Sequence, residues 1–306
     1  MSSVAVTAQT AGQGAARAAA RRRARNHGAG AAVRRPGWVT YALLGLALVI
    51  SAFPLYYTLL LGSSDQVTIS QRPLPQLVPD LSIVERFGQI MASTQINFWL
   101  ALANSLIIAV TVSLAVVLFS TLAGFSFAKL SFRGRGPLLI FVIATMAVPT
   151  QLGIIPLYIL MSELDWIGKI QAVIVPSLVS AFGVFWMTQY LEEALPYELI
   201  EAARVDGASM IRTFWSIALP AARPAAAMLG LFTFVQQWTN FFWPSIVLGS
   251  RNPTLPIAVQ NLQAGYHDDF SLIMGGVFLV TLPLLVIFAF VGRQLVAGIM
   301  QGAVKG

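Results

Sequence analysis

The chain has 306 residues, of which 57% are hydrophobic and only 10% are charged, and its mean hydropathy is +0.75. Because soluble domains carry about 25% charged residues, this composition excludes a soluble globular protein and indicates an integral membrane protein. The formal net charge is +7, and the chain contains no cysteine. Disulfides, thiol nucleophiles and cysteine-ligated metal sites are therefore excluded.

The first 37 residues differ in composition from the rest of the chain. They are rich in Ala, Gly and Arg, contain seven of the 19 basic residues, and precede the first acidic residue, Asp65. We predict a disordered, basic cytoplasmic tail over residues 1–37 that fixes orientation and contacts membrane lipid head groups. Nucleic-acid binding and an organelle transit peptide are less favoured alternatives. A cleaved signal peptide is not expected, because the apolar run that follows is too long.

Six apolar runs without charges follow this tail. Each can supply the roughly 20 residues that a helix needs to cross about 30 Å of hydrocarbon. The sequence therefore predicts an all-α integral membrane protein with six transmembrane helices, preceded in the second run by a short surface helix near 80–87. The predicted transmembrane helices are 38–61, 99–127, 137–161, 170–190, 224–248 and 270–292.

The basic residues outside these spans are distributed unequally between the two faces. With six spans, 15 of the Lys and Arg residues lie on the side of both termini and four lie on the opposite side. By the positive-inside rule, both termini are predicted to be cytoplasmic. The loop 191–223, between the fourth and fifth spans, then lies in the cytoplasm as well.

This cytoplasmic loop has the pattern of a helix, a glycine turn and a second helix. Pro196 suits a first helical position, and Gly207 suits a helix stop because glycine tolerates the left-handed conformation. A second, amphipathic helix is expected over 210–219, ending at Pro220. Its apolar residues predicted to face the membrane are Ile211, Phe214, Trp215 and Ile217. The residues alone leave two interpretations open: a docking surface for a soluble partner, or an ordinary interfacial connector.

A longer pattern carries a family resemblance. Glu201-Ala202-Ala203, three residues, Gly207, nine residues, Ile217, one residue and Leu219-Pro220 resemble the EAA loop of permease subunits in bacterial ABC importers. Further stretches are similar to the carbohydrate branch, typified by the maltose importer's permease: NSLIIA from Asn104, FSFAKLSFRGRG from Phe125, PTQLGIIPLYIL from Pro149, AFGVFW from Ala181, TLP from Thr254 and the terminal LVAGIMQGAVKG. Two departures concern Trp238-Thr239-Asn240-Phe241, where the family often has Trp-Asn-Glu-Phe, and Thr188-Gln189, where it often has Arg-Gln.

The resemblance implies a type I ABC importer architecture, with a permease domain over 38–306 in the bacterial cytoplasmic membrane. Its implied partners are a second, homologous permease subunit, two ATPase subunits and an extracytoplasmic solute-binding protein. ATP and Mg²⁺ would be bound by the ATPases, and no cofactor by this chain. The implied solute is a carbohydrate, a disaccharide or short oligosaccharide, with a glycerol-phosphate-type compound as the alternative. The implied ATPase-coupling residues are Glu198, Glu201, Ala202, Ala203, Asp206, Gly207, Ile217, Leu219 and Pro220.

Other functional classes find less support in the sequence. The one Gly-Lys pair, Gly168-Lys169, is followed by Ile170 and lacks the upstream glycine of a P-loop. An ion-coupled secondary transporter is disfavoured because the interiors of the predicted spans lack ionisable residues. A membrane-embedded enzyme is the least favoured class. The two histidines, His27 and His267, lie outside the predicted spans, and no cluster has the spacing of metal ligands.

The fifth predicted span is the candidate solute path. Its residues Thr233, Gln236, Asn240 and Trp243 fall three or four apart, so they are predicted to share one face of the helix. Amides can pair with sugar hydroxyls, and an indole offers an apolar platform. The alternative is that these groups bond to neighbouring spans. In the second span, Ser120, Gly124 and Ala128 recur every four residues, a pattern that predicts close helix packing within the subunit.

Overall fold

The structure is a computed structural model that describes residues 37–71, 77–94, 96–266 and 269–303. Of the predicted tail 1–37, only Gly37 lies within the described residues. The chain divides into two compact units, residues 1–54 and 55–306, which are described separately. The described part of the first unit, 37–54, is the apolar first part of helix α2. The described residues are helical or irregular and contain no strand.

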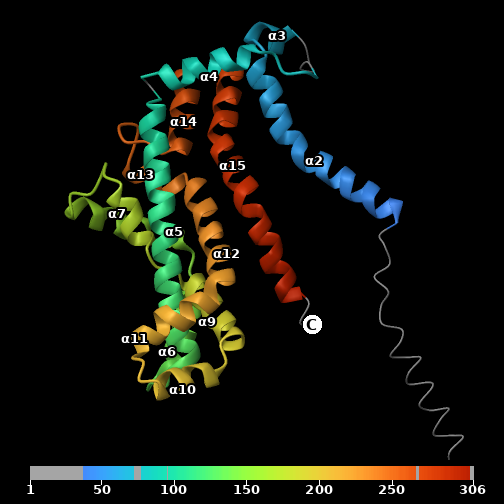
Figure 1. The fold of residues 1–306 in the computed structure, drawn as a ribbon. Coiled ribbons are helices and arrows are strands. Elements are labelled where there is room, and N and C mark those ends of the chain that lie inside the picture. Colours follow the sequence, from blue (N-terminus) through green and yellow to red (C-terminus); the bar gives the residue numbers. More distant parts are fainter. Residues whose placement is uncertain (1–36, 72–76, 95, 267–268, 304–306) are drawn as a thin grey trace, which may run out of the picture. The chain divides into compact units, whose positions relative to one another are not determined.

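Helices make up almost all of the second unit (Figure 1). Five helical segments are long and apolar enough to cross a membrane among the described residues, and a bent helix pair makes a sixth. In chain order the elements are α2 (Trp38–Ser63), α3 (Gln66–Gln71), α4 (Ser82–Ala92), α5 (Phe98–Lys129), α6 (Arg135–Thr145), η1 (Thr150–Gly153), α7 (Ile154–Glu163), α8 (Gln171–Ile174), η2 (Val175–Ser177), α9 (Ala181–Ala194), α10 (Tyr197–Val205), α11 (Met210–Thr213), η3 (Phe214–Ala218), α12 (Leu219–Trp238), α13 (Phe242–Val247), α14 (Leu255–Gly265) and α15 (Phe270–Ala303).

The predicted spans are confirmed in four cases and corrected in two. The first, second and sixth are the long helices α2, α5 and α15, and the fourth comprises α8, the turn η2 and α9. The third is not one helix: α6 and the segment 150–163 are bent by 88°. The break precedes Pro149, and the residue before a proline is disfavoured in the helical region.

The fifth span was predicted wrongly at both ends. It begins at Met210 instead of 224, runs through η3 and α12, and ends at Trp238 instead of 248. Pro244 explains the early end, because a proline has no N–H to donate to the carbonyl of Asn240. The chain leaves the helix at Thr239 and resumes as the short α13. Helix α14 was not predicted.

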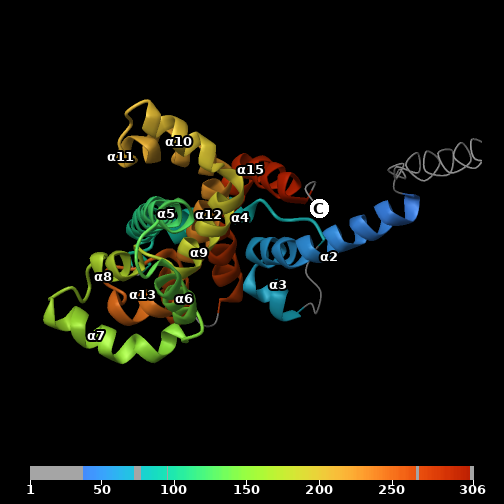
Figure 2. The same cartoon turned by 90° about the horizontal axis from the view of Figure 1, so that it is seen from below.

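Helix α5 lies at the centre of the main core and packs side by side with α9 and α12, as the two views agree (Figure 2). Its fully buried residues Ile108, Val112 and Val116 form this core together with Met187 of α9 and Leu229 of α12. Lipid tails are as apolar as these side chains, so within a membrane their contacts stabilise the fold mainly through close packing.

The predicted small-residue stripe of α5 is where α9 approaches most closely. A β-carbon placed on Gly124 would lie 2.7 Å from Cβ of Met187 and 2.8 Å from its carbonyl carbon. On α9, a β-carbon at Gly183 would collide with the hydroxyl group of Ser120. Packing within the subunit is therefore confirmed as the role of Ser120 and Gly124. Only glycine fits at positions 124 and 183 without a shift of the neighbouring helix.

A second core joins the other end of α5 to α4, α14 and α15. Buried polar groups of α5 fix the chain that follows α13: Asn104 donates to Asn252 at 2.7 Å and to the carbonyl of Pro253 at 2.9 Å. The hydroxyl of Ser105 accepts a 2.8 Å bond from the N–H of Leu255, at the start of α14. These bonds set where α14 begins relative to α5.

We predict that Gly124→Ala lowers the thermal unfolding midpoint of the purified membrane complex. The added methyl meets backbone atoms of α9, and overpacking of this kind costs about 1–3 kcal/mol. The matched control is Gly88→Ala in α4, where a β-carbon meets nothing within 4 Å. Both changes raise helix propensity by about 1 kcal/mol, so a midpoint that falls in neither variant, or in both, would contradict the close contact.

Candidate functional site

The loop from Pro196 to Pro220, hereafter the EAA loop, is a helix, a tight turn and a second helix, as predicted. Helix α10 starts one residue after Pro196 and ends in a Schellman motif around Gly207. The N–H of Ala208 donates to the carbonyl of Ala203 at 2.9 Å, and the N–H of Gly207 donates to that of Arg204 at 3.0 Å. Gly207 has φ of 76°, which confirms its left-handed conformation.

The beginning of α10 is attached to the end of α5 and to α9. The hydroxyl of Tyr197 donates to the carbonyl of Ala128 at 3.2 Å. The ammonium group of Lys129, which is buried, donates to the carbonyl of Glu192 at 3.0 Å and lies 4.5 Å from the centre of the Tyr197 ring. A buried charge needs such partners to offset its desolvation. Arg135 adds an exposed ion pair to Glu192 at 3.4 Å.

The far end of the loop is continuous with α12. Ser209 caps α11 by accepting the N–H of Arg212 at 3.3 Å, and the chain then passes through the π-helical segment η3. The predicted helix end at Pro220 is therefore wrong. The N–H of Leu219 donates to the carbonyl of Phe214, five residues earlier. This wider turn accommodates Pro220 in the first turn of α12, where its missing N–H breaks no regular bond.

The predicted coupling residues fall into two groups by exposure. Glu198, Glu201, Ala202, Asp206 and Gly207 are exposed. Ala203, predicted to lie on a docking surface, is instead buried, as is Ile200, which belongs to the main core. The reason is the helical period, which places residues three apart on the same face.

The remaining three predicted coupling residues, Ile217, Leu219 and Pro220, are half-buried. Ile217 and Leu219 pack against the main core. They attach the loop to the bundle and present little surface to a partner.

Exposed apolar side chains surround the acidic groups and were not predicted as part of the site. Val205 is 88% exposed, and Leu199 is 48% exposed on the same helix. Ile211 is 74% exposed and Trp215 is 54% exposed, as expected for side chains facing a membrane or a partner. Phe214 was predicted to face the membrane, but it is buried with its ring centre 5.9 Å from that of Phe125. The inward position of Ile200 could have indicated that Val205 points outward.

The four solute-path candidates do not share one helix face, because α12 ends before two of them. The hydroxyl of Thr233 donates to the carbonyl of Leu229 at 2.8 Å within α12, and the indole of Trp243 in α13 donates to the carbonyl of Ala172 at 2.9 Å. Asn240 lies in the break between the helices and is half-buried. Gln236 is exposed on α12. The structure thus separates the set that the sequence placed together.

Metal ligation finds no support in the described part of the chain, which contains no group of three His, Asp or Glu side chains that could hold an ion. In the sequence His267-Asp268-Asp269, which could bind a cation but is predicted to be a solvated loop, His267 and Asp268 lie outside the described residues. Two carboxyl groups outside the spans have a pKa below the ordinary value. Hydrogen bonds from Thr68 lower the pKa of Asp65, and a hydrogen bond from Lys169 lowers that of Asp165. Both belong to helix capping and local pairing.

The fold and this loop define a class, namely multi-pass helical membrane proteins with an amphipathic loop fixed to the core. The chain belongs to the family of binding-protein-dependent transport system inner membrane components, whose model matches residues 117–297. It is therefore a permease subunit of an ABC importer.

Curated relatives and a solved structure agree with this assignment. An arabinooligosaccharides transport system permease protein of Halalkalibacterium halodurans is 32% identical, over 86% of this chain and 95% of its own length. A lactose transport system permease protein of Rhizobium radiobacter is 31% identical, over 89% and 97%. An sn-glycerol-3-phosphate transport system permease protein of Salmonella typhi is 26% identical, over 86% and 94%. A chain of a bacterial ABC transporter involved in import of the acidic polysaccharide alginate shares the fold, with a TM-score of 0.71 over 84% of this chain and 95% of its own at 20% identity.

We predict that Gly207→Ala loosens the EAA loop, whereas Gly207→Asn does so much less. A β-carbon in the left-handed region costs about 1–2 kcal/mol, and Asn is the residue besides glycine that tolerates this conformation. Hydrogen exchange of the amides of α10 and α11 in the purified complex measures the effect. Equal exchange in the alanine variant and the unmodified protein would show that the turn does not hold the two helices.

Proposed function

We propose that this chain is one of the two permease subunits of a carbohydrate importer. A second, homologous permease, two ATPase subunits and an extracytoplasmic solute-binding protein would complete the complex, as the family description of a binding-protein-dependent system suggests. ATP and Mg²⁺ would be bound in the ATPases, and this chain would bind no cofactor. The proposed solute is a disaccharide or short oligosaccharide. Arabinooligosaccharide and lactose permeases among the relatives support this choice.

In this proposal, the EAA loop transmits the motion of the ATPases to the transmembrane helices. One observation carries the idea: Glu198 and Glu201 form an exposed acidic surface on α10, whose beginning is bonded to α5. The hydrogen-bonded turn at Gly207 joins the other end of α10 to the helical segment that starts at Met210 and runs on into α12. A rigid connection of this kind is needed if closure of an ATPase dimer is to reorient spans from inward-open to outward-open. A flexible loop would absorb the movement instead.

Orientation and domain limits complete the proposal. Residues 38–306 would form the permease domain in a bacterial cytoplasmic membrane, with both termini and the EAA loop in the cytoplasm. The basic tail over 1–37 would contact anionic lipid. The exposed Val205 and Ile211 would then face the ATPase beside the acidic groups, since this end of the bundle would lie in water.

A second candidate solute is a glycerol-phosphate-type compound, favoured by the relative in Salmonella typhi. An ion-coupled secondary transporter is the weakest alternative, because it would need ionisable groups within the spans. Arg223 lies in α12, close to the end that joins the EAA loop, and its side chain is exposed. It therefore does not supply a buried ionisable group for ion coupling.

Reconstitution into liposomes tests the proposed function. We expect the lone purified chain to neither transport solute nor hydrolyse ATP. With its three kinds of partner, it should import lactose or arabinooligosaccharides only when ATP is present on the ATPase side. Import of glycerol 3-phosphate and of neither sugar would replace the proposed solute. Flux through the lone chain would overturn the importer mechanism itself.

We predict that Glu201→Lys leaves membrane insertion unchanged but weakens ATPase binding and uptake. Reversing a charge at an interface costs about 2–5 kcal/mol, so uptake should fall roughly tenfold or more. Co-purification of the ATPase subunits and solute uptake measure the two effects. The matched control is Glu193→Lys, an exposed carboxylate at the end of α9 outside the EAA loop. Normal uptake in Glu201→Lys, or an equal loss in both variants, would refute the assigned role.

A further inference from the structure

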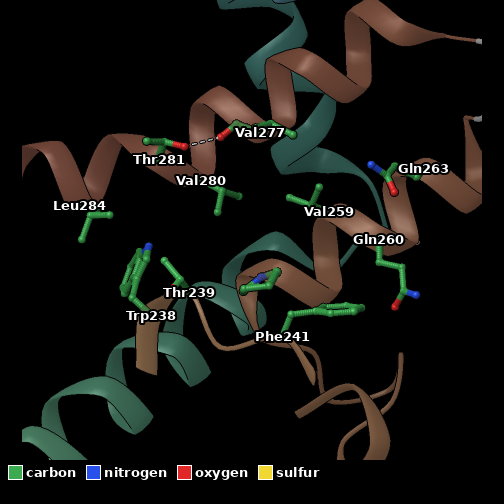
Figure 3. A pocket seen from close by; sticks show the side chains of 11 residues that line it. Trp238, Thr239, Phe241, Val259, Gln260, Gln263, Val277, Val280, Thr281 and Leu284 are labelled. Atoms are coloured by element: carbon green, nitrogen blue, oxygen red, sulfur yellow. Dashed lines mark hydrogen bonds between the residues drawn. The ribbon is translucent and has the colours of Figure 1, made fainter. Parts of the chain in front are cut away.

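A pocket of about 530 Å³ lies among α12, α14 and α15, away from the EAA loop. Figure 3 shows the amides of Gln260 and Gln263 on one side of this pocket and Trp238 with Leu284 on the other. Phe241 and the hydroxyl-bearing Thr281 also line it. Pockets of about 300–1,000 Å³ hold small-molecule ligands. None of the solute-path candidates named from the sequence lines this pocket.

The break after α12 forms part of the pocket wall. Thr239 and Phe241 belong to the irregular segment between α12 and α13, and both line the pocket. Irregular backbone at membrane depth is tolerated only where it is buried in protein or lines a hydrated cavity. The irregular segment at Thr239 meets this condition where it borders the pocket.

The position of the pocket along α12 indicates at which end of the second unit it lies. The continuous helical segment from Met210 to Trp238 contains 29 residues, which at 1.5 Å per residue span roughly 40 Å. The pocket thus lies toward the end of the unit opposite the EAA loop, where α14 is seen in Figure 1. In the proposed importer, this is the side from which a binding protein delivers its sugar.

The chemistry of the lining fits a sugar ring. Aromatic side chains offer apolar surfaces for the C–H faces of a ring, and amides both donate to and accept from hydroxyl groups. Gln260 and Gln263 are exposed and lie three residues apart on one face of α14. Neither amide forms a hydrogen bond with the described residues of the chain, so both are free to bind. The described lining contains no Lys or Arg to pair with a phosphate.

We propose that this pocket is a subsite for one uncharged sugar ring of the imported saccharide, bound by the amides of Gln260 and Gln263 against the exposed ring of Phe241. The proposal rests on the proposed function, since it assumes that the solute is a carbohydrate. The proposal assigns the contact with the sugar to helix α14 and to the segment at the end of α12, and not to a single face of the fifth span.

The test uses the full importer complex in liposomes, with lactose and arabinooligosaccharides as probes. Gln260→Ala combined with Gln263→Ala removes two hydrogen-bonding groups without touching the core. Loss of these bonds should lower sugar uptake roughly tenfold. Stimulation of ATP hydrolysis by the sugar-loaded binding protein should stay unchanged, because the EAA loop is intact. The matched control is Gln89→Ala, an exposed amide on α4 that does not line the pocket.

A second measurement uses the absence of cysteine in the chain. A single Gln263→Cys should react with a maleimide more slowly when a transported sugar is present, whereas Gln89→Cys should react at the same rate with and without it. Equal labelling of Gln263→Cys in both conditions would overturn the subsite.

The outcomes separate this proposal from the one on which it rests. If the unmodified complex imports neither sugar, the proposed function fails and the subsite fails with it. If the unmodified complex imports sugar and the double variant does so equally well, the subsite alone is overturned. If the double variant loses both uptake and stimulated ATP hydrolysis, the two glutamines support assembly and the subsite is likewise overturned.

Discussion

Hydrocarbon offers no partner to an unpaired peptide group, and this constraint bears on three places where the chain departs from regular helix. The π turn at η3 lies within the EAA loop, directly before α12, with Phe214 and Ala218 buried in the main core. The loop before α14 is bonded to Asn104 and Ser105 of α5. The break at Thr239 borders a pocket. Each departure from regular helix is thus placed against protein or a cavity.

The same constraint explains why α5 is the reference element of the second unit. One end of α5 carries the polar groups that fix the start of α14, and the other carries Lys129 and the carbonyl that receives Tyr197. Between them, Gly124 allows the backbone of α9 to approach within direct contact. Helix α5 is therefore bonded at one end to the chain that leads into α14 and at the other end to the EAA loop. The positions of the EAA loop and of α14, which lines the pocket, both depend on this one helix.

Much of this arrangement could be predicted from the sequence, because long apolar runs and the EAA pattern are local signals. The glycine turn at Gly207 and the small-residue contact at Gly124 were predicted correctly for the same reason. The errors concern non-local effects. Pro220 has the pattern of a helix end, but a π turn accommodates it. Pro244 was predicted within one continuous span, but it lies in the short helix α13, which residues 239–241 separate from α12. Ala203 matches a docking motif in sequence, yet tertiary packing buries it. The pocket combines residues from three helices, and no stretch of sequence displays that combination.

The uninterrupted course from Met210 to Trp238 has a mechanical consequence. Because this segment stays helical through η3 and past Pro224, a displacement of one end can be passed to the other. The first non-helical stretch beyond the EAA loop is at Thr239. A tilt of this helix would consequently change the shape of the cavity that this stretch borders. The contacts between the cavity and a bound solute would change with it.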